Sequence, residues 1–200
     1  MENKIEEGEI VLPKIQETES VWKLVRFAVV AILIVIPIRI FIAQPFVVSG
    51  SSMFPTFHNG EYLIVDELSY RLREPQRDEV TIFRYPKDPK KFYIKRIIGL
   101  PNETIDISGS SVTVTNTEHP DGFILEQPFV ENNSNNITHF ELKADEYFVM
   151  GDNRAQSSDS RYWGAVPRKN LIGKAFLRLF PLNKLGISPG SYKQDNSQVK

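Results

Sequence analysis

The segment Phe92-Tyr93-Ile94-Lys95-Arg96-Ile97-Ile98 is typical of a β-strand, because five of its seven side chains are aromatic or β-branched. A turn signal, Gly99-Leu100-Pro101, follows it directly. Successive side chains of a strand point to opposite faces, so Lys95 lies on the same face as Tyr93 and Ile97. The segment therefore predicts a strand that carries Lys95 among apolar neighbours on one face and Arg96 on the other.

Shorter runs of the same kind recur along the chain after residue 45. They are residues 62–65, 80–85, 104–107, 111–114, 147–150 and 171–179, separated by glycine and proline. No long apolar repeat of 3.6 residues occurs there, so the sequence predicts a mainly β domain with a minor helical part. Residues 102–140 are rich in Asn, Thr, Glu and Pro and predict an inserted loop or small β-ribbon, with a polar tip at Asn132–Asn136.

The composition of the 200-residue chain excludes several classes of protein. With 41% hydrophobic and 24% charged residues, it is neither wholly disordered nor a polytopic membrane protein. A formal net charge of −1 gives no indication of nucleic-acid binding. The absence of cysteine excludes a disulfide framework, a thiolate zinc site and a cysteine nucleophile. No His, Asp and Glu residues have metal-ligand spacing, so we expect no metal and no cofactor.

A hydrophobic segment at residues 21–43 precedes the β-rich part. It contains three charged residues, Lys23, Arg26 and Arg39. A membrane-spanning helix needs about 20 residues, and its terminal arginines can reach the headgroups. We therefore favour a retained single-pass signal anchor over a cleaved signal peptide or a buried core helix. Phe41 is too large for position −3 of a cleavage site after Ala43.

The charges beside this segment predict its orientation. Residues 1–20 carry six acidic and two basic side chains and predict a polar tail. Lys23 and Arg26 flank the apolar core on its N-terminal side, so the positive-inside rule places the N-terminus in the cytoplasm. Everything after residue 43 then lies on the outer face of the membrane. Residues 182–200 predict a polar, frayed C-terminal tail.

Three polar clusters adjoin predicted strands: Ser49–Phe57, Tyr93–Pro101 and Gly151–Gly164. A serine hydroxyl is a poor nucleophile until a neighbouring base takes its proton. The histidines lie in polar turns or beside the insertion, and none is in a setting that favours this role: His58, His119 and His139. Lys95 is the other candidate base, provided that burial lowers the pKa of its amine. The residues alone leave open a lysine that points outward from an edge strand.

In this order, and behind one N-terminal span, the clusters resemble the bacterial type I signal peptidases (leader peptidases). Ser52-Met53-x-Pro55-Thr56 is similar to the nucleophile box of that family, and Tyr93–Pro101 to its lysine box. Gly151-Asp152-Asn153-Arg154, with Ser157 and Asp159–Gly164, resembles its last box. The similarity runs, with gaps, over residues 22–180. It implies convoluted antiparallel β-sheets of the signal-peptidase type, preceded by a single transmembrane helix.

The resemblance also implies a role for each matched residue. Ser52 is the nucleophile and one oxyanion donor through its N–H, Lys95 is the general base, and Ser157 hydrogen-bonds to the Lys95 amine. A salt-bridged support consists of Arg96, Asp152, Arg154, Asp159 and Arg161. Shallow pockets for the small residues at −1 and −3 of a signal peptide are lined by Phe46, Val48, Met53, Phe57, Tyr93 and Ile94.

The sequence departs from the family pattern at several positions. Some members place a serine two residues before the nucleophile as a second oxyanion donor, and here that position is Gly50, which leaves Ser49 and Ser51 as candidates. Arg77-Asp78-Glu79 stands where the family usually reads Arg-Gly-Asp, so a turn glycine is missing. Ala155 and Gln156 replace an acid and an amide.

The predicted function is a membrane-bound serine endopeptidase that removes signal peptides from exported preproteins after small residues. Its catalytic core comprises residues 44–101 and 141–181. It is expected in the bacterial plasma (inner) membrane, with signal peptides and the lipid bilayer as partners, the export translocon nearby and no nucleic acid. Two alternatives are a self-cleaving repressor-type Ser–Lys peptidase and a catalytically inactive anchored module that binds preproteins. The predicted anchor and the lack of a DNA-binding helix pair argue against the first.

Overall fold

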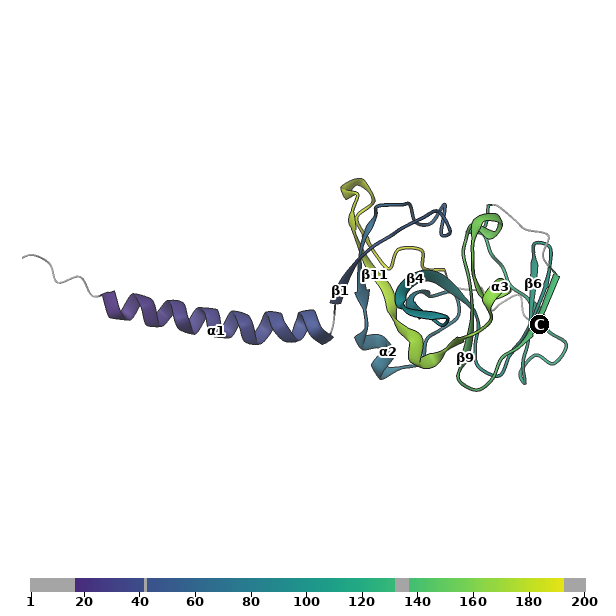
Figure 1. Cartoon of the computed structure of the whole chain (residues 1–200), viewed down its shortest axis with the longest axis horizontal. Coiled ribbons are helices and arrows are strands. Elements are labelled where there is room, and N and C mark those ends of the chain that lie inside the picture. Colours follow the sequence, from purple (N-terminus) through teal and green to yellow (C-terminus); the bar gives the residue numbers. More distant parts are fainter. Residues whose placement is uncertain (1–16, 42, 132–136, 193–200) are drawn as a thin grey trace, which may run out of the picture. The chain divides into compact units, whose positions relative to one another are not determined.

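The structure, a computed structural model, describes residues 17–41, 43–131 and 137–192. Figure 1 traces the chain, which divides into two units, Met1–Ile38 and Arg39–Lys200. The polar tip predicted at Asn132–Asn136 lies outside the described residues, as does most of the predicted tail at 1–20.

Helix α1, Glu17–Phe41, carries the hydrophobic segment of the sequence. It begins four residues before the predicted segment 21–43. Every side chain from 21 to 35 except Ala31 is exposed. No helix within the described ranges has the length and apolar character that a membrane span requires.

Eight strands of the described chain form the larger, antiparallel sheet. Their order is β1-β2-β11-β3-β4-β9-β10, and β12 pairs with β11. The strands are β1 Ala43–Val47, β2 Tyr62–Asp66, β3 Val80–Tyr85, β4 Asp88–Gly99, β9 Glu146–Met150, β10 Val166–Pro167, β11 Leu171–Phe180 and β12 Gly186–Ile187. The prediction of a mainly β fold is confirmed. Strand β1 was not expected, because Pro45 interrupts it and it overlaps the end of the predicted span.

A second sheet of four strands occupies the predicted insertion. Its order is β7-β6-β5-β8, with β5 Thr104–Ser108, β6 Ser111–Thr115, β7 Phe123–Ile124 and β8 Ile137–Glu141. The buried faces of Ile105 and Val114 pack against Ile98 and Phe148 of the larger sheet. The insertion, which the sequence predicted as a loop or small β-ribbon, thus forms a small antiparallel sheet whose apolar face joins the core.

Strand β4 is covered on both faces at its C-terminal end, where residues 95–99 are all buried. One core cluster includes Val65 and Ile82, with Ile94 packed against it, and another includes Phe83 and Ile97. This double burial explains the nearly continuous apolar run of the strand. Because neighbouring side chains alternate, Lys95 and Arg96 are buried on opposite faces.

Short helices and the C-terminal residues complete the domain. They are α2 Leu68–Leu72, α3 Ser160–Trp163, and the 3₁₀ turns η1 Arg154–Gln156, η2 Arg168–Asn170 and η3 Leu182–Lys184. The segment predicted as a frayed tail returns to the domain as far as Tyr192, whose hydroxyl donates to Glu126. Strand β12 pairs with β11 there, and the carbonyl of Gly190 accepts a hydrogen bond from Arg96.

Candidate active site

Ser52 lies in a compact turn that follows β1. Gly50 has a φ of +91°, a conformation that glycine adopts more easily than other residues. Its N–H donates to the side chain of Asn59. The N–H of Phe57 donates to the carbonyl of Met53 at 2.8 Å, which closes the turn. Met53 and Phe57 are both buried in the core and hold the turn against the sheet. The turn thus holds Ser52 in a defined position, with its side chain half-buried.

Lys95 reaches Ser52 from β4. Its Nζ donates to Ser52 Oγ at 2.6 Å and to the carbonyl of Ile94 at 3.0 Å. The side chain is only 4% exposed, and burial lowers the pKa of the amine to about 8, although Asp159 and Asp152 act in the opposite direction. A substantial fraction of the amine is therefore neutral near physiological pH and able to accept the serine proton.

A cavity of about 410 Å³ opens beside this pair. Four of the predicted pocket residues line it: Phe46, Val48, Tyr93 and Ile94. Leu63 and Ile82 add apolar surface, and Ser52 and Lys95 contribute polar groups. Met53 and Phe57 do not line the cavity, because both side chains point into the core. None of the three histidines lines it either.

Ser157 is buried close to the backbone of Ser52, but among the described residues no hydrogen bond joins it to Lys95, where the resemblance implied one. Its Oγ has no hydrogen-bond partner in the structure. Gly151 permits this approach, because a Cβ there would overlap both Ser157 Oγ and the carbonyl oxygen of Ser52. The glycine of the last box is therefore required by the proximity of the two serine-bearing segments.

Arg96 and Asp152 form one half of the predicted support. The guanidinium meets the carboxylate in a two-pronged contact, with N···O distances of 2.9 and 2.6 Å, and both side chains are fully buried. Arg96 also donates to the carbonyls of Asp78 and Gly190. Thr56, in the serine turn, donates to Asp152 at 2.5 Å. This ion pair therefore links β4, the serine turn and the last box.

Arg161 and Asp159 form the other half. Nε and Nη2 of Arg161 each donate to the Asp159 carboxylate at 2.8 Å, and Asp159 accepts the N–H of Gly151. Arg154 donates to the carbonyl of Gly151 at 3.0 Å. Burial lowers the pKa of Arg154 to about 10. The five predicted support residues are all buried, and they fix the last box rather than face the cavity.

Asn153 connects the last box to Ser52 and Ser51 by hydrogen bonds. Its N–H donates to the carbonyl of Ser52 at 3.1 Å and its Nδ2 to the carbonyl of Ser51 at 3.2 Å. Sequence reasoning quoted Asn153 within the box but gave it no role. The signal was present, because an asparagine that is buried in a polar turn usually satisfies backbone groups.

Comparisons with known proteins identify the family of this chain. The family model described as "Signal peptidase, peptidase S26" matches residues 21–180. A probable signal peptidase I-2 from Synechocystis sp. is 38% identical over 176 residues, which cover 84% of this chain and 78% of the relative. A signal peptidase I from Leptolyngbya laminosa is 34% identical over 164 residues, 78% of each chain. The chain belongs to the signal peptidase family.

Among solved structures, a signal peptidase I from Enterococcus faecalis V583 is 28% identical to this chain. It matches 51% of this chain and 97% of its own, with a TM-score of 0.43. The family assignment rests on the sequence matches, and it makes this chain a serine endopeptidase by class. Within the described residues, no group of three or more His, Cys, Asp or Glu side chains could hold a metal ion.

The structure shows the surroundings of two positions at which this chain departs from its family pattern. Asp78 adopts a φ of +66°, so the turn keeps a left-handed conformation without the glycine. Its N–H donates to the carbonyl of Ile97, and the neighbouring Arg77 pairs with Glu103 at 2.6 Å. Beside Gly50, the hydroxyl of Ser51 donates to Gln156 at 3.2 Å. Gln156 thus engages one of the two serines that were candidates for the second donor.

Proposed function

We propose that this peptidase cleaves signal peptides from exported preproteins, with Ser52 as nucleophile and Lys95 as general base. The observation that carries the proposal is the 2.6 Å contact between Lys95 Nζ and Ser52 Oγ, with the amine buried. A buried lysine that lacks a carboxylate at hydrogen-bond distance is costly unless it loses its proton, and the lowered pKa reflects this. Such an amine is suited to activate a hydroxyl.

The proposed reaction has two halves. In the first, Ser52 Oγ attacks the carbonyl carbon of the residue at −1 while its proton passes to Lys95. The tetrahedral intermediate then collapses, the C–N bond breaks, and Lys95 returns the proton to the leaving amine. In the second half, water attacks the ester carbon and gives a proton to Lys95; the bond between that carbon and Ser52 Oγ then breaks, Oγ takes the proton from Lys95, and the signal peptide leaves with a new carboxyl end. The N–H of Ser52 stabilises the oxyanion in both halves.

The cavity supports a preference for small side chains at −1 and −3. Its apolar walls come from β1 and β4, so an extended peptide can lie between Phe46 and Tyr93. Because neighbouring side chains of an extended peptide alternate, those at −1 and −3 would enter the same wall. We expect cleavage to be lost when Ala at −1 is replaced by Leu in an otherwise unchanged preprotein.

We infer further that α1 anchors the peptidase in the bacterial plasma membrane, with residues 44–200 on the outer face. Although no helix in the described ranges meets the length and apolar character of a span, the sequence segment 21–43 offers 23 residues with only three charged side chains, which is the length that a span needs. Exposed apolar side chains along it, such as Phe27 and Leu33, favour a lipid environment over water. A nearby export translocon would supply the preproteins.

Cleavage of a preprotein whose signal ends in Ala-x-Ala tests the chemistry. The full chain in detergent should release the mature product, and Ser52→Ala should lower turnover by about 10³-fold or more. Ser110→Ala, in the exposed turn between β5 and β6, is the matched control and should keep full activity. Equal cleavage by Ser52→Ala would remove the dyad from the mechanism. Binding without cleavage by a folded wild-type chain would favour the inactive preprotein-binding module.

Extraction of membranes with alkaline carbonate tests the anchor separately. The full chain should remain with the membrane pellet. Protease added outside spheroplasts should degrade residues after 43 and leave a tag at the N-terminus intact. Release of the chain into the supernatant, or loss of the tag, would contradict the proposed topology without affecting the proposed chemistry.

A further inference from the structure

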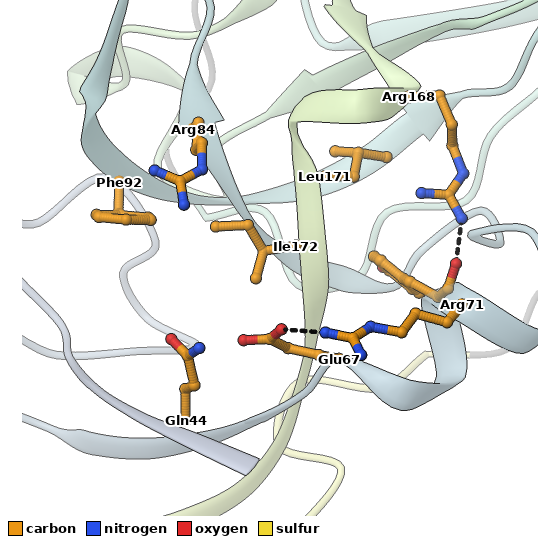
Figure 2. Close-up of a pocket in the computed structure, with 9 residues that line it drawn as sticks. Gln44, Glu67, Arg71, Arg84, Phe92, Arg168, Leu171 and Ile172 are labelled. Carbon is orange, nitrogen blue, oxygen red and sulfur yellow. Dashed lines mark hydrogen bonds and ion pairs between the residues drawn. The ribbon is translucent and has the colours of Figure 1, made fainter. Parts of the chain in front are cut away.

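A second cleft, of about 280 Å³, lies between β1, α2, β4 and β11, away from Ser52 and Lys95. Three arginines line it: Arg71, Arg84 and Arg168. Figure 2 shows Arg84 on one side and Arg71 and Arg168 on the other, with Leu171 and Ile172 between them. Glu67 is the one acidic residue that lines the cleft, so the lining carries a net positive charge. A cleft of this charge favours an anionic ligand.

Arg168 and Arg84 are held in position by contacts that use only part of their hydrogen-bonding capacity. Arg168 donates through Nε to Glu74 at 2.8 Å and through Nη2 to the carbonyl of Tyr70. Arg84 donates through Nη1 to the carbonyl of Pro89 at 3.4 Å and stacks over Phe92. A guanidinium has five N–H donors, so both retain donors for a ligand. Arg71 is paired with Glu67 at 3.4 Å, at the edge of the same cleft.

One residue that lines the cleft follows the end of α1 closely in the sequence. Gln44, on β1, lines it and follows Phe41, the last residue of α1, by three residues. Three residues span at most about 10 Å, because an extended chain advances by about 3.5 Å per residue. If α1 is the membrane anchor, as the proposed function has it, the chain itself keeps Gln44 within this reach of the end of the anchor. Basic groups close to a membrane surface attract anionic lipids.

The remaining walls fit the rest of a lipid headgroup. Phe92, Leu171 and Ile172 give the cleft an apolar side next to its guanidinium groups. Arginine pairs with phosphate through two parallel N–H···O bonds, which lysine cannot match. We propose that this cleft binds the phosphodiester of an anionic phospholipid headgroup, of the kind that phosphatidylglycerol presents. This inference rests on the proposed membrane anchor and goes beyond the peptidase chemistry.

Phe92 connects the two sites, because it lines both the arginine cleft and the cavity beside Ser52. It also contacts Phe46 edge to face, with ring centroids 5.6 Å apart. Strand β1 is shared in the same way, with Gln44 on the cleft and Phe46 on the cavity. A lipid bound in the cleft would therefore contact Phe92, which also lines the cavity proposed for the substrate.

Native mass spectrometry of the full chain in detergent can test the proposal. Phosphatidylglycerol, phosphatidylcholine and inorganic phosphate are titrated separately. We expect one phosphatidylglycerol to be retained at concentrations where phosphatidylcholine is not. The double variant Arg71→Gln/Arg84→Gln should weaken this retention by about tenfold or more, as expected for loss of charge-assisted phosphate contacts. Lys169→Gln removes the same charge from an exposed neighbour of Arg168 outside the cleft and should change retention less than twofold.

Equal retention of the two lipids, or equal retention by the double variant and the wild type, would overturn the proposal. Displacement of the lipid by millimolar inorganic phosphate would assign the cleft to free phosphate and overturn the lipid source. Circular dichroism of each variant checks folding, and the single variant Arg71→Gln provides a milder test. Ser52→Ala should keep full lipid retention while it loses preprotein cleavage. Failure of the lipid site and failure of the peptidase function are therefore distinguished in one preparation.

Discussion

Lys95 and Arg96 are consecutive, buried cations of β4, yet the two faces of the strand treat their charges in opposite ways. On one face, no carboxylate of the residues that the structure describes lies within hydrogen-bond distance of Lys95, and burial lowers the pKa of its amine to about 8. On the other face, Arg96 donates two hydrogen bonds to the Asp152 carboxylate, and two backbone carbonyls accept from the same guanidinium. Desolvation without an adjacent counter-ion favours a neutral base, whereas desolvation with a paired carboxylate favours a fixed charge.

The largest expected effect tests whether Lys95 must be neutral. Lys95→Arg keeps a cation of similar length, but a guanidinium does not lose its proton in proteins. We expect turnover of a preprotein to fall by about 10³-fold or more, comparable to the loss of a catalytic-triad member. An arginine variant that keeps more than a tenth of the wild-type rate would contradict a general-base role for Lys95.

The pH profile of the wild type sharpens the same point. The neutral fraction of Lys95 falls about tenfold per pH unit below its pKa of about 8. The value of kcat/KM should therefore rise by about 50-fold between pH 6 and 8 and level off above the pKa. Melting temperatures recorded over the same range show whether the chain stays folded. A flat profile with an unchanged melting temperature would mean that another group accepts the serine proton.

The stability of methionine variants compares the two faces directly. Arg96→Met leaves the buried Asp152 without its partner and should lower the free energy of unfolding by about 3–5 kcal/mol. Lys95→Met removes a buried amine that lacks such a partner, so the free energy of unfolding should stay within about 1 kcal/mol or increase. Urea unfolding of both variants beside the wild type measures the difference. Equal destabilisation would mean that Lys95 is also a structural cation.

Much of this contrast could be predicted from the sequence, because strands and boxes are local signals. Residues 80–85 were predicted with the observed bounds of β3, and the predicted strand at 92–98 lies within β4. The three polar clusters suggested the Ser52–Lys95 pair even though 43 positions separate the two residues. Their alternation on a strand also separates Lys95 from Arg96.

Other features depend on tertiary partners that no local pattern reveals. Strand β1 contains Pro45 and is stabilised by pairing with β2. Strand β8 consists mostly of polar residues and is stabilised by pairing with β5. The pocket role expected for Met53 and Phe57 depended on which way the serine turn faces, and the turn directs both side chains into the core. The arginine cleft brings together residues from 44 to 172, which have no motif in common.

The smallest expected effect concerns Ser157 and asks whether burial alone sets the protonation of Lys95. The resemblance implied a hydrogen bond from Ser157 to the amine, but Ser157 Oγ has no partner in the structure. Ser157→Ala removes a hydroxyl that satisfies no other group, so the free energy of unfolding should change by less than about 1 kcal/mol. Turnover should fall less than tenfold, and the inflection of the pH profile should stay near 8. A loss of 10²-fold or more with a shifted inflection would mean that Ser157 orients the amine once substrate is bound, and that desolvation is only part of what makes Lys95 a base.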